Sequence, residues 1–270
     1  MLPDIEGAGE RLAMARLTTG LAVLNTLWHL PPGEVLEQHR PTDVEPARML
    51  SAEQYEALRR LAFVAVGAWT LGAEHKAVKF AANVSFAAVQ RHVAQFDQRA
   101  WNYNSNLNVY LLLLSLTDTR GGEARDQSDP AVASAVLRAM RLYYGCVYFQ
   151  SALSKLMLSG PAWADGRTLR GSWAELGTRT GKWLSTKPMG VAVAASALAL
   201  GFELAFPAAQ VMLRRRPRLL GLASLGFHAS VKATMDISFW HHAVHAVPLF
   251  VAPPEAGRWP AAVWRRRRRR

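Results

Sequence analysis

The 270-residue sequence contains a single cysteine, Cys146, so no intrachain disulfide can form. Because this cysteine lies in the apolar stretch "LYYGCVYF", we expect a buried and inert thiol. The sequence also has no glycine-rich phosphate loop, no nucleophile elbow and no dinucleotide fingerprint. The enzyme classes that depend on those motifs therefore have no support.

Nucleic-acid binding is also poorly supported, although the formal net charge is +12. There is no zinc-finger spacing and no stripe of basic residues interleaved with aromatic ones. The arginines gather in "RRRPR" at 214–218 and "RRRRRR" at 265–270, and the second run also fits a disordered or non-native tail. Beside apolar segments, such clusters are typical of the cytoplasmic face and of contact with anionic lipid. We predict a lipid membrane as partner, no nucleic acid, and a cytoplasmic C-terminus.

Long apolar segments rich in alanine, leucine and valine predict an all-α fold. Segment 188–213 carries one charge, Glu203, and is longer than the ~20 residues that cross a hydrocarbon core. We therefore predict a polytopic transmembrane helical bundle of about seven or eight apolar helices, without a β-domain, as one domain over 1–270. The mean hydropathy is close to zero, so a soluble helical protein stays open as the alternative. The expected apolar segments are 12–30, 61–73, 77–90, 107–116, 132–158, 188–213 and two within 219–252.

The connecting segments are polar. Residues 31–58 contain four prolines and predict a loop followed by the start of a helix, where "SAEQ" from Ser51 fits a capping box. Residues 118–130 and 159–187 are expected to form loops. The polar N-terminal stretch "MLPDIEGAGER" is not typical of a cleavable leader, so we expect none.

Ionisable residues inside apolar segments are costly and are candidates for function. The alternative is internal pairing, of Glu203 with a lysine or of Asp236 with Lys232 one helical turn away. His241 and His245 share a helical face, but no third ligand accompanies them, so we predict no metal site and favour aromatic packing. The full set is Arg16, Lys79, Lys155, Glu203, His228, Lys232, Asp236, His241, His242 and His245.

The segment "YFQSALSKLMLSGPAWADGRTLR" at 148–170 is the most informative one. Lys155 is the only charge between Arg141 and Asp165, and the apolar run breaks soon after it at Gly160. A lysine in this position either extends its ammonium group to an interface or, when partly desolvated, acts as a base.

This segment resembles the vitamin K-dependent γ-carboxylase family, whose membrane part is the HTTM domain. The most specific piece is "YFQSALSKL" followed by "W.DG". Shorter similarities occur in the same order along most of the chain: "MARLTTGL" (14–21), "WNYNSNLNVYLLLLSL" (101–116), "FELAFPAAQVMLRRRPR" (202–218) and "FHASVKATMDISFW" (227–240).

The resemblance implies a catalytic role for Lys155, as the base that deprotonates reduced vitamin K or a related quinol. Oxygen then yields a strong base that removes a proton from a peptide glutamate, and CO2 adds to the carbanion. The implied substrate-binding residues are Asn102, Asn104, Trp163, Asp165 and His228. Asn104 stands where the carboxylases keep a functional histidine, and asparagine does not titrate near neutral pH.

The resemblance further implies a bacterial inner-membrane location and a small peptide or protein substrate. A substrate-presenting partner protein would replace the large extramembrane domain of the animal enzymes. Two other functions stay open. One is that of a bacterial toxin-peptide maturation or export factor of the same family. The other is that of a non-enzymatic membrane scaffold or immunity protein, in which Lys155 is only an interfacial anchor.

Overall fold

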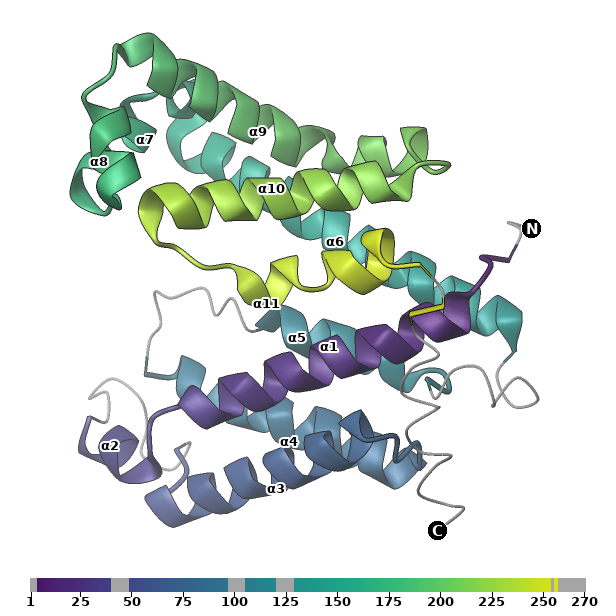
Figure 1. The fold of residues 1–270 in the computed structure, drawn as a ribbon. Helices are drawn as coiled ribbons and strands as arrows, with labels where there is room; N and C mark the ends of the chain where they lie inside the picture. The colour runs from purple at the N-terminus through teal and green to yellow at the C-terminus, as the bar shows by residue number, and fades with distance from the viewer. Residues whose placement is uncertain (1–3, 40–48, 97–104, 120–128, 254, 257–270) are drawn as a thin grey trace. The chain divides into compact units, whose positions relative to one another are not determined.

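The computed structural model describes residues 4–39, 49–96, 105–119, 129–253 and 255–256. This part of the chain is helical and contains no strand, in agreement with the helical content expected from the sequence (Figure 1). The chain divides into two compact units, Met1–Leu137 with Pro253–Arg270, and Arg138–Ala252. The prediction of one domain over 1–270 stays a prediction.

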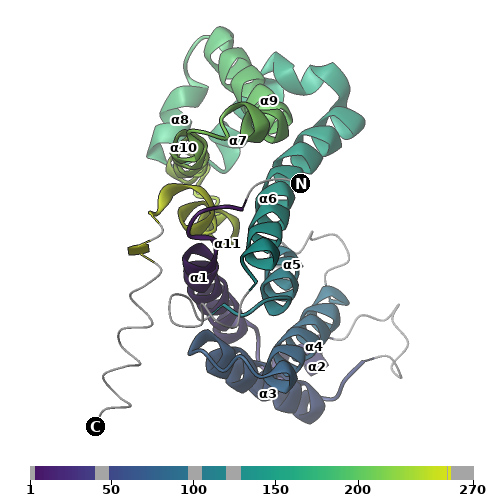
Figure 2. The same cartoon turned by 90° about the vertical axis from the view of Figure 1, so that its right-hand side faces the viewer.

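The first unit is built from α1 (Ala8–His29), α2 (Gly33–Gln38), α3 (Ala52–Thr70), α4 (Lys76–Ala94), α5 (Ser105–Ser115) and the start of α6 (Pro130–Ser159). Helix α3 begins at the predicted capping box, because Ser51 Oγ accepts from the Gln54 N–H and the Gln54 side chain accepts from the Ser51 N–H. Helices α3 and α4 form an antiparallel hairpin (Figures 1 and 2). The largest side chains fully enclosed in this unit are Trp69, Tyr55, Tyr110 and Phe86.

The second unit contains the rest of α6, a 3-10 helix η2 (Gly160–Asp165), α7 (Arg167–Glu175), α8 (Arg179–Ser185), α9 (Met189–Met212), α10 (Pro217–Met235), α11 (Trp240–Ala243) and a π-helical turn η3 (Val247–Val251). The structure thus differs from the expected loop over 159–187, most of which folds into three short helices. Helices α7 and α8 contact each other, and α7 packs on α9. Helices α9 and α10 lie side by side (Figure 1).

The prediction of seven or eight transmembrane helices is wrong. Within the described residues, only α9 is long and apolar enough to cross a membrane. Helix α5 is apolar but has 11 residues, and α3 and α4 carry several charges along 19 residues each. The apolar runs in the sequence are therefore parts of shorter or mixed helices, not of separate spans.

Two further expectations also fail. The two membrane spans expected within 219–252 are not present, because α10 ends at Met235 and the next residue, Asp236, has a left-handed backbone with φ 57°. Only short turns of helix follow. Cys146 is exposed, not buried, because it lies on the outward face of α6 while Tyr144 and Tyr148 occupy the inward face. An apolar sequence context does not fix the direction of a side chain on a helix.

Candidate functional site

Lys155 and Glu203 form an ion pair between α6 and α9. The Lys155 ammonium donates to both carboxylate oxygens of Glu203 and to Ser151 Oγ at 3.2 Å. Ser151 Oγ in turn donates to Glu203 Oε1, also at 3.2 Å. The Glu203 side chain is 5% exposed, whereas that of Lys155 is 23% exposed. The carboxylate is therefore enclosed, and the lysine alone gives the pair access to the surroundings.

Helix geometry explains why these groups meet. Ser151 and Lys155 are four residues apart on α6, so they share one face. Glu203 belongs to the only buried stripe of α9, whose members recur every three or four residues: Ala192, Ser196, Leu200, Glu203 and Phe206. Beside this stripe, Phe202 stacks on Phe227 and Gln210 donates to the Arg141 carbonyl oxygen, and the exposed side chains of α9 are apolar. The structure thus contains the pairing of Glu203 with a lysine that the sequence left open as an alternative.

The predicted residues Trp163 and Asp165 lie in η2, directly after α6. Lys155 Nζ lies 4.9 Å from the centroid of the Trp163 ring, a distance typical of a cation–π contact. Asp165 instead accepts a hydrogen bond from the Arg167 N–H at 2.8 Å, next to the N-terminus of α7. The structure therefore brings Trp163 to Lys155, whereas Asp165 bonds to Arg167 at the start of α7.

Gly166 is what allows this segment to return to α9. Its φ is 80°, in the left-handed region where side chains are strained, and a Cβ there would lie 2.5 Å from the Val193 backbone nitrogen. The "W.DG" sequence thus combines a ring beside Lys155 with a glycine that permits close backbone packing.

His228 lies in a separate hydrogen-bonded chain of the second unit. Its Nε2 lies 2.7 Å from Tyr148 Oη, and Ser224 Oγ lies 2.7 Å from Tyr148 Oη and 2.5 Å from Tyr144 Oη. The His242 ring stacks on Tyr144 with centroids 4.0 Å apart. Within the described residues His228 makes no hydrogen bond to Lys155 or Glu203, and its role in substrate binding stays a prediction.

Burial keeps these histidines neutral near neutral pH. It lowers the pKa of His228, His241 and His245 to about 4 each, and that of His242 well below its ordinary value. His245 Nδ1 lies 2.8 Å from the His241 carbonyl oxygen, and the helix α11 that contains His241 ends at Ala243. Within the described residues no group of three metal-ligating side chains occurs.

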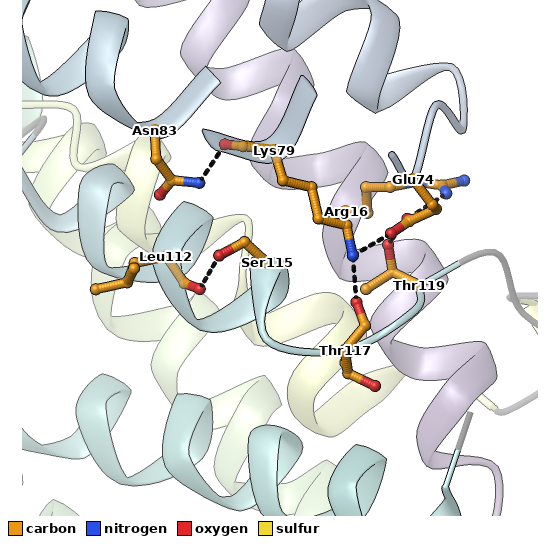
Figure 3. A network of polar contacts seen from close by, with 8 residues as sticks. All are labelled: Arg16, Glu74, Lys79, Asn83, Leu112, Ser115, Thr117 and Thr119. Atoms are coloured by element: carbon orange, nitrogen blue, oxygen red, sulfur yellow. Dashed lines mark hydrogen bonds and ion pairs between the residues drawn. The ribbon is translucent and has the colours of Figure 1, made fainter. Parts of the chain in front are cut away.

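The first unit has a second buried ionic cluster, between α1, the α3–α4 connection, α4 and the segment after α5 (Figure 3). Glu74 Oε1 accepts from Arg16 Nη1 at 3.1 Å and from Thr119 Oγ1, and Glu74 Oε2 lies 2.5 Å from Lys79 Nζ. Lys79 Nζ also donates to the Thr117 carbonyl oxygen at 2.7 Å. Arg16 and Lys79 are candidates from the sequence, whereas Glu74 was missed because it lies in the short "EHK" connection.

Other predicted residues fall outside or at the edge of the site. Asn102 and Asn104 lie outside the described residues. Lys232 and Asp236 pair one turn apart at 2.5 Å, as the sequence left open, and both are exposed. Sequence reasoning missed Ser151, although its spacing of four residues from Lys155 was a signal available in "SALSK".

Comparison with known proteins gives no family for this chain. No family model matches it, and no curated protein or solved structure matches it either. The resemblance to the γ-carboxylase family therefore stays a prediction that depends on the short sequence segments alone.

Proposed function

We propose that the protein is a membrane-bound enzyme in which Lys155 and Glu203 exchange a proton with a lipid-soluble quinol. The observation that carries this proposal is the placement of the pair. A carboxylate is buried on α9, the one described helix that is long and apolar enough to cross a membrane, and its lysine partner keeps access to the outside. Ionisable groups are costly in such a place and are retained mainly where they function.

The membrane location is supported by the surface of α9. Only 28% of its most apolar stretch is buried, so it is unlike the core helix of a soluble protein. Leu198, Val211 and Met212 are among its most exposed side chains. An exposed arginine cluster follows the helix at once, with Arg214, Arg215, Arg216 and Arg218. A long exposed apolar helix with cations at its end is suited to lipid and to anionic headgroups.

The proton chemistry follows from the hydrogen bonds of the pair. The net charge of the Lys155–Glu203 pair is zero in two proton arrangements. The first has an ammonium and a carboxylate, and the second has an amine and a carboxylic acid. In the second arrangement the amine of Lys155 accepts the proton of a quinol hydroxyl. The pair then holds one additional proton, with Glu203 protonated and Lys155 as ammonium, and the quinol leaves as its anion. Ser151 keeps both groups in register through its two hydrogen bonds.

The surroundings fit an aromatic substrate. The Trp163 ring lies beside the ammonium, and a flat ring offers a face on which another aromatic ring can stack. A bound quinol supplies the electrons that reduce O2, as the resemblance implies. Addition of CO2 to a peptide glutamate, the peptide itself and a presenting partner are part of the same proposal.

A second candidate function is that of a membrane scaffold. The same ion pair favours this function. The hydrogen bonds of Lys155 to Ser151 and Glu203 connect α6 to α9, and this connection stabilises the fold whether or not a reaction takes place. The two functions differ in what they require of Lys155. An enzyme needs an amine that gives and takes a proton, and a scaffold needs only a cation.

The test is a quinol-oxidation assay on the full chain reconstituted in lipid nanodiscs, with reduced vitamin K or menaquinol and O2. We expect turnover by the wild type and a loss of about 10²–10⁴ in rate for Lys155→Ala. Lys232→Ala is the matched control, since it removes the lysine of an exposed pair and should leave the rate unchanged. If the wild type turns over none of the quinols, the proposed enzymatic function is contradicted and the scaffold function remains.

A further inference from the structure

The α3–α4 hairpin has an outward face that is apolar over its middle. From Leu61 to Leu71 every exposed side chain of α3 is apolar, and the same holds for α4 from residue 77 to residue 90. The most exposed of them are Val64 at 69% and Phe80 at 70%. We call the set Leu61, Phe63, Val64, Leu71, Phe80 and Val84 the hairpin face.

Packing of the first unit does not account for this face. The inward side of each helix already supplies the core with its own apolar residues, which are Ala62, Val66 and Trp69 on α3 and Ala82, Phe86 and Val89 on α4. Both helices are thus apolar on two sides, whereas a helix on the surface of a soluble protein needs only one. Exposed apolar area of this extent marks an interaction surface.

Charges at the ends of the hairpin face are mainly positive. Arg60 and Arg91 are exposed toward one end, since the Tyr55–His92 ring contact at 5.1 Å places the end of α4 beside the start of α3. Lys76 is exposed at the other end. Among the acidic residues of the described hairpin, only Glu53, in the first turn of α3, is exposed, and Glu56 is half-buried beside Arg59.

We propose that the hairpin face lies on an anionic lipid bilayer, parallel to its plane. This inference depends on the membrane location given under the proposed function. Residues 61–71 extend about 16 Å at ~1.5 Å per residue, half of the ~30 Å hydrocarbon core, so the face is too short to cross it. An apolar face with cations at both ends is suited to the boundary between headgroups and acyl chains.

The neighbouring α1 extends the same surface. Trp28 is 74% exposed and its ring lies 6.5 Å from that of Phe63. Tryptophan is enriched at membrane interfaces, where its ring sits at the level of the headgroups.

A second copy of the chain is a less suitable occupant. Two hairpin faces related by a two-fold axis would bring Arg60, Lys76 and Arg91 of one copy near the same cations of the other. Like charges across an interface oppose association, whereas anionic headgroups attract all three.

The experiment places a fluorescent NBD label at one cysteine of the full chain. In a Cys146→Ser background, the labelled variants are Val64→Cys on the hairpin face, Leu198→Cys on α9 and Glu53→Cys as an exposed polar control. The vesicles contain brominated phosphatidylcholine and phosphatidylglycerol in equal parts. We expect bromine quenching at positions 64 and 198 and none at 53. In vesicles without phosphatidylglycerol, quenching at 64 should weaken and quenching at 198 should persist.

The outcomes separate the hairpin face from the membrane location. Quenching at 198 without quenching at 64 overturns the hairpin face and leaves the membrane location intact. Quenching at 64 alone supports the hairpin face and contradicts the role of α9. Absence of quenching at both positions removes the membrane location and the hairpin face together. Disulfide-linked dimers of unlabelled Val64→Cys, with position 64 unquenched, would assign the face to a second copy.

Discussion

The two units each bury a carboxylate that is paired with a lysine, and they enclose it differently. In the first unit Glu74 lies between Arg16 and Lys79, whose side chains are 4% and 11% exposed. In the second unit Glu203 is as buried as Glu74, but Lys155 is 23% exposed and lies beside an aromatic ring. The ion pair is thus enclosed by protein in the first unit and partly accessible from outside in the second.

This difference in exposure distinguishes a pair enclosed within the fold from the pair for which we propose a reaction. Lys79 directs its ammonium to Glu74 and to the Thr117 carbonyl oxygen, and so joins α4 to the segment after α5. Among the described residues, Lys155 donates only to Ser151 and Glu203, lies beside the Trp163 ring of η2 and keeps 23% of its side chain exposed. A buried pair that no substrate can reach serves only to hold the fold, whereas an accessible one can exchange protons.

The largest expected effect is the response of the second unit to acid. His228, His241, His242 and His245 are neutral when folded and become protonated when unfolded, because burial lowers their pKa in the folded state. The unfolded chain binds more protons below pH 6.5, so stability falls as the pH drops from about 6.5 toward 4. Each fully enclosed histidine, His242 and His245, costs about 1.4 kcal/mol per pH unit in that range, whereas the partly exposed His241 contributes less because solvent screens its charge.

Hydrogen exchange followed by mass spectrometry between pH 7 and pH 4.5 checks this, with rates corrected for intrinsic pH dependence. Protection of α10 and α11 should fall before that of α3 and α4. Loss of protection in both units at the same pH would show that the histidines do not set the acid response. His228→Gln should flatten the pH dependence of the second unit.

The second-largest expected effect is the loss of stability caused by Glu74→Gln. Glu74→Gln leaves Arg16 and Lys79 without their carboxylate, and removal of one partner of a buried ionic group typically costs about 3–5 kcal/mol. Urea unfolding should show this loss, while the exposed control Glu53→Gln should change stability by less than about 0.5 kcal/mol. A small effect of Glu74→Gln would mean that the cluster is not closed as described.

The smallest effect is expected at the exposed pair of α10. The Lys232 and Asp236 side chains are 55% and 71% exposed. Asp236→Asn keeps a residue that tolerates the left-handed backbone and removes only the charge, so thermal unfolding should change by about 0.3–0.5 kcal/mol. A loss of several kcal/mol would contradict the expectation that an exposed ion pair contributes much less to stability than a buried one.

Several features of the fold were predictable from local sequence. The capping box at Ser51 and the apolar length of 188–213 each depend on residues close together in the chain. The number of membrane-crossing helices was not predictable in this way. Apolar runs such as 61–73 belong to longer helices whose other residues are charged, and a run by itself does not show where its helix begins.

The candidate site was predictable in part. Lys155 and Trp163 come from the same segment of sequence, and the structure places them together. The choice of Glu203 as the partner of Lys155 depends on how α6 packs on α9. The two residues are about fifty positions apart in the chain, so local sequence does not show this contact. The exposure of Cys146 likewise depends on which face of α6 turns inward, and that is set by partners elsewhere in the sequence.

The central claim is that Lys155 exchanges a proton, and Lys155→Arg tests it most directly. Arginine keeps the cation and its pairing with Glu203 but does not deprotonate in proteins. In nanodiscs with a quinol and O2, Lys155→Arg should lower the rate by about 10²–10⁴ while the melting temperature stays near that of the wild type. Lys232→Arg, measured in parallel, should match the wild type in both. Full activity in Lys155→Arg would show that the residue acts as a fixed cation and would contradict the proton-transfer site.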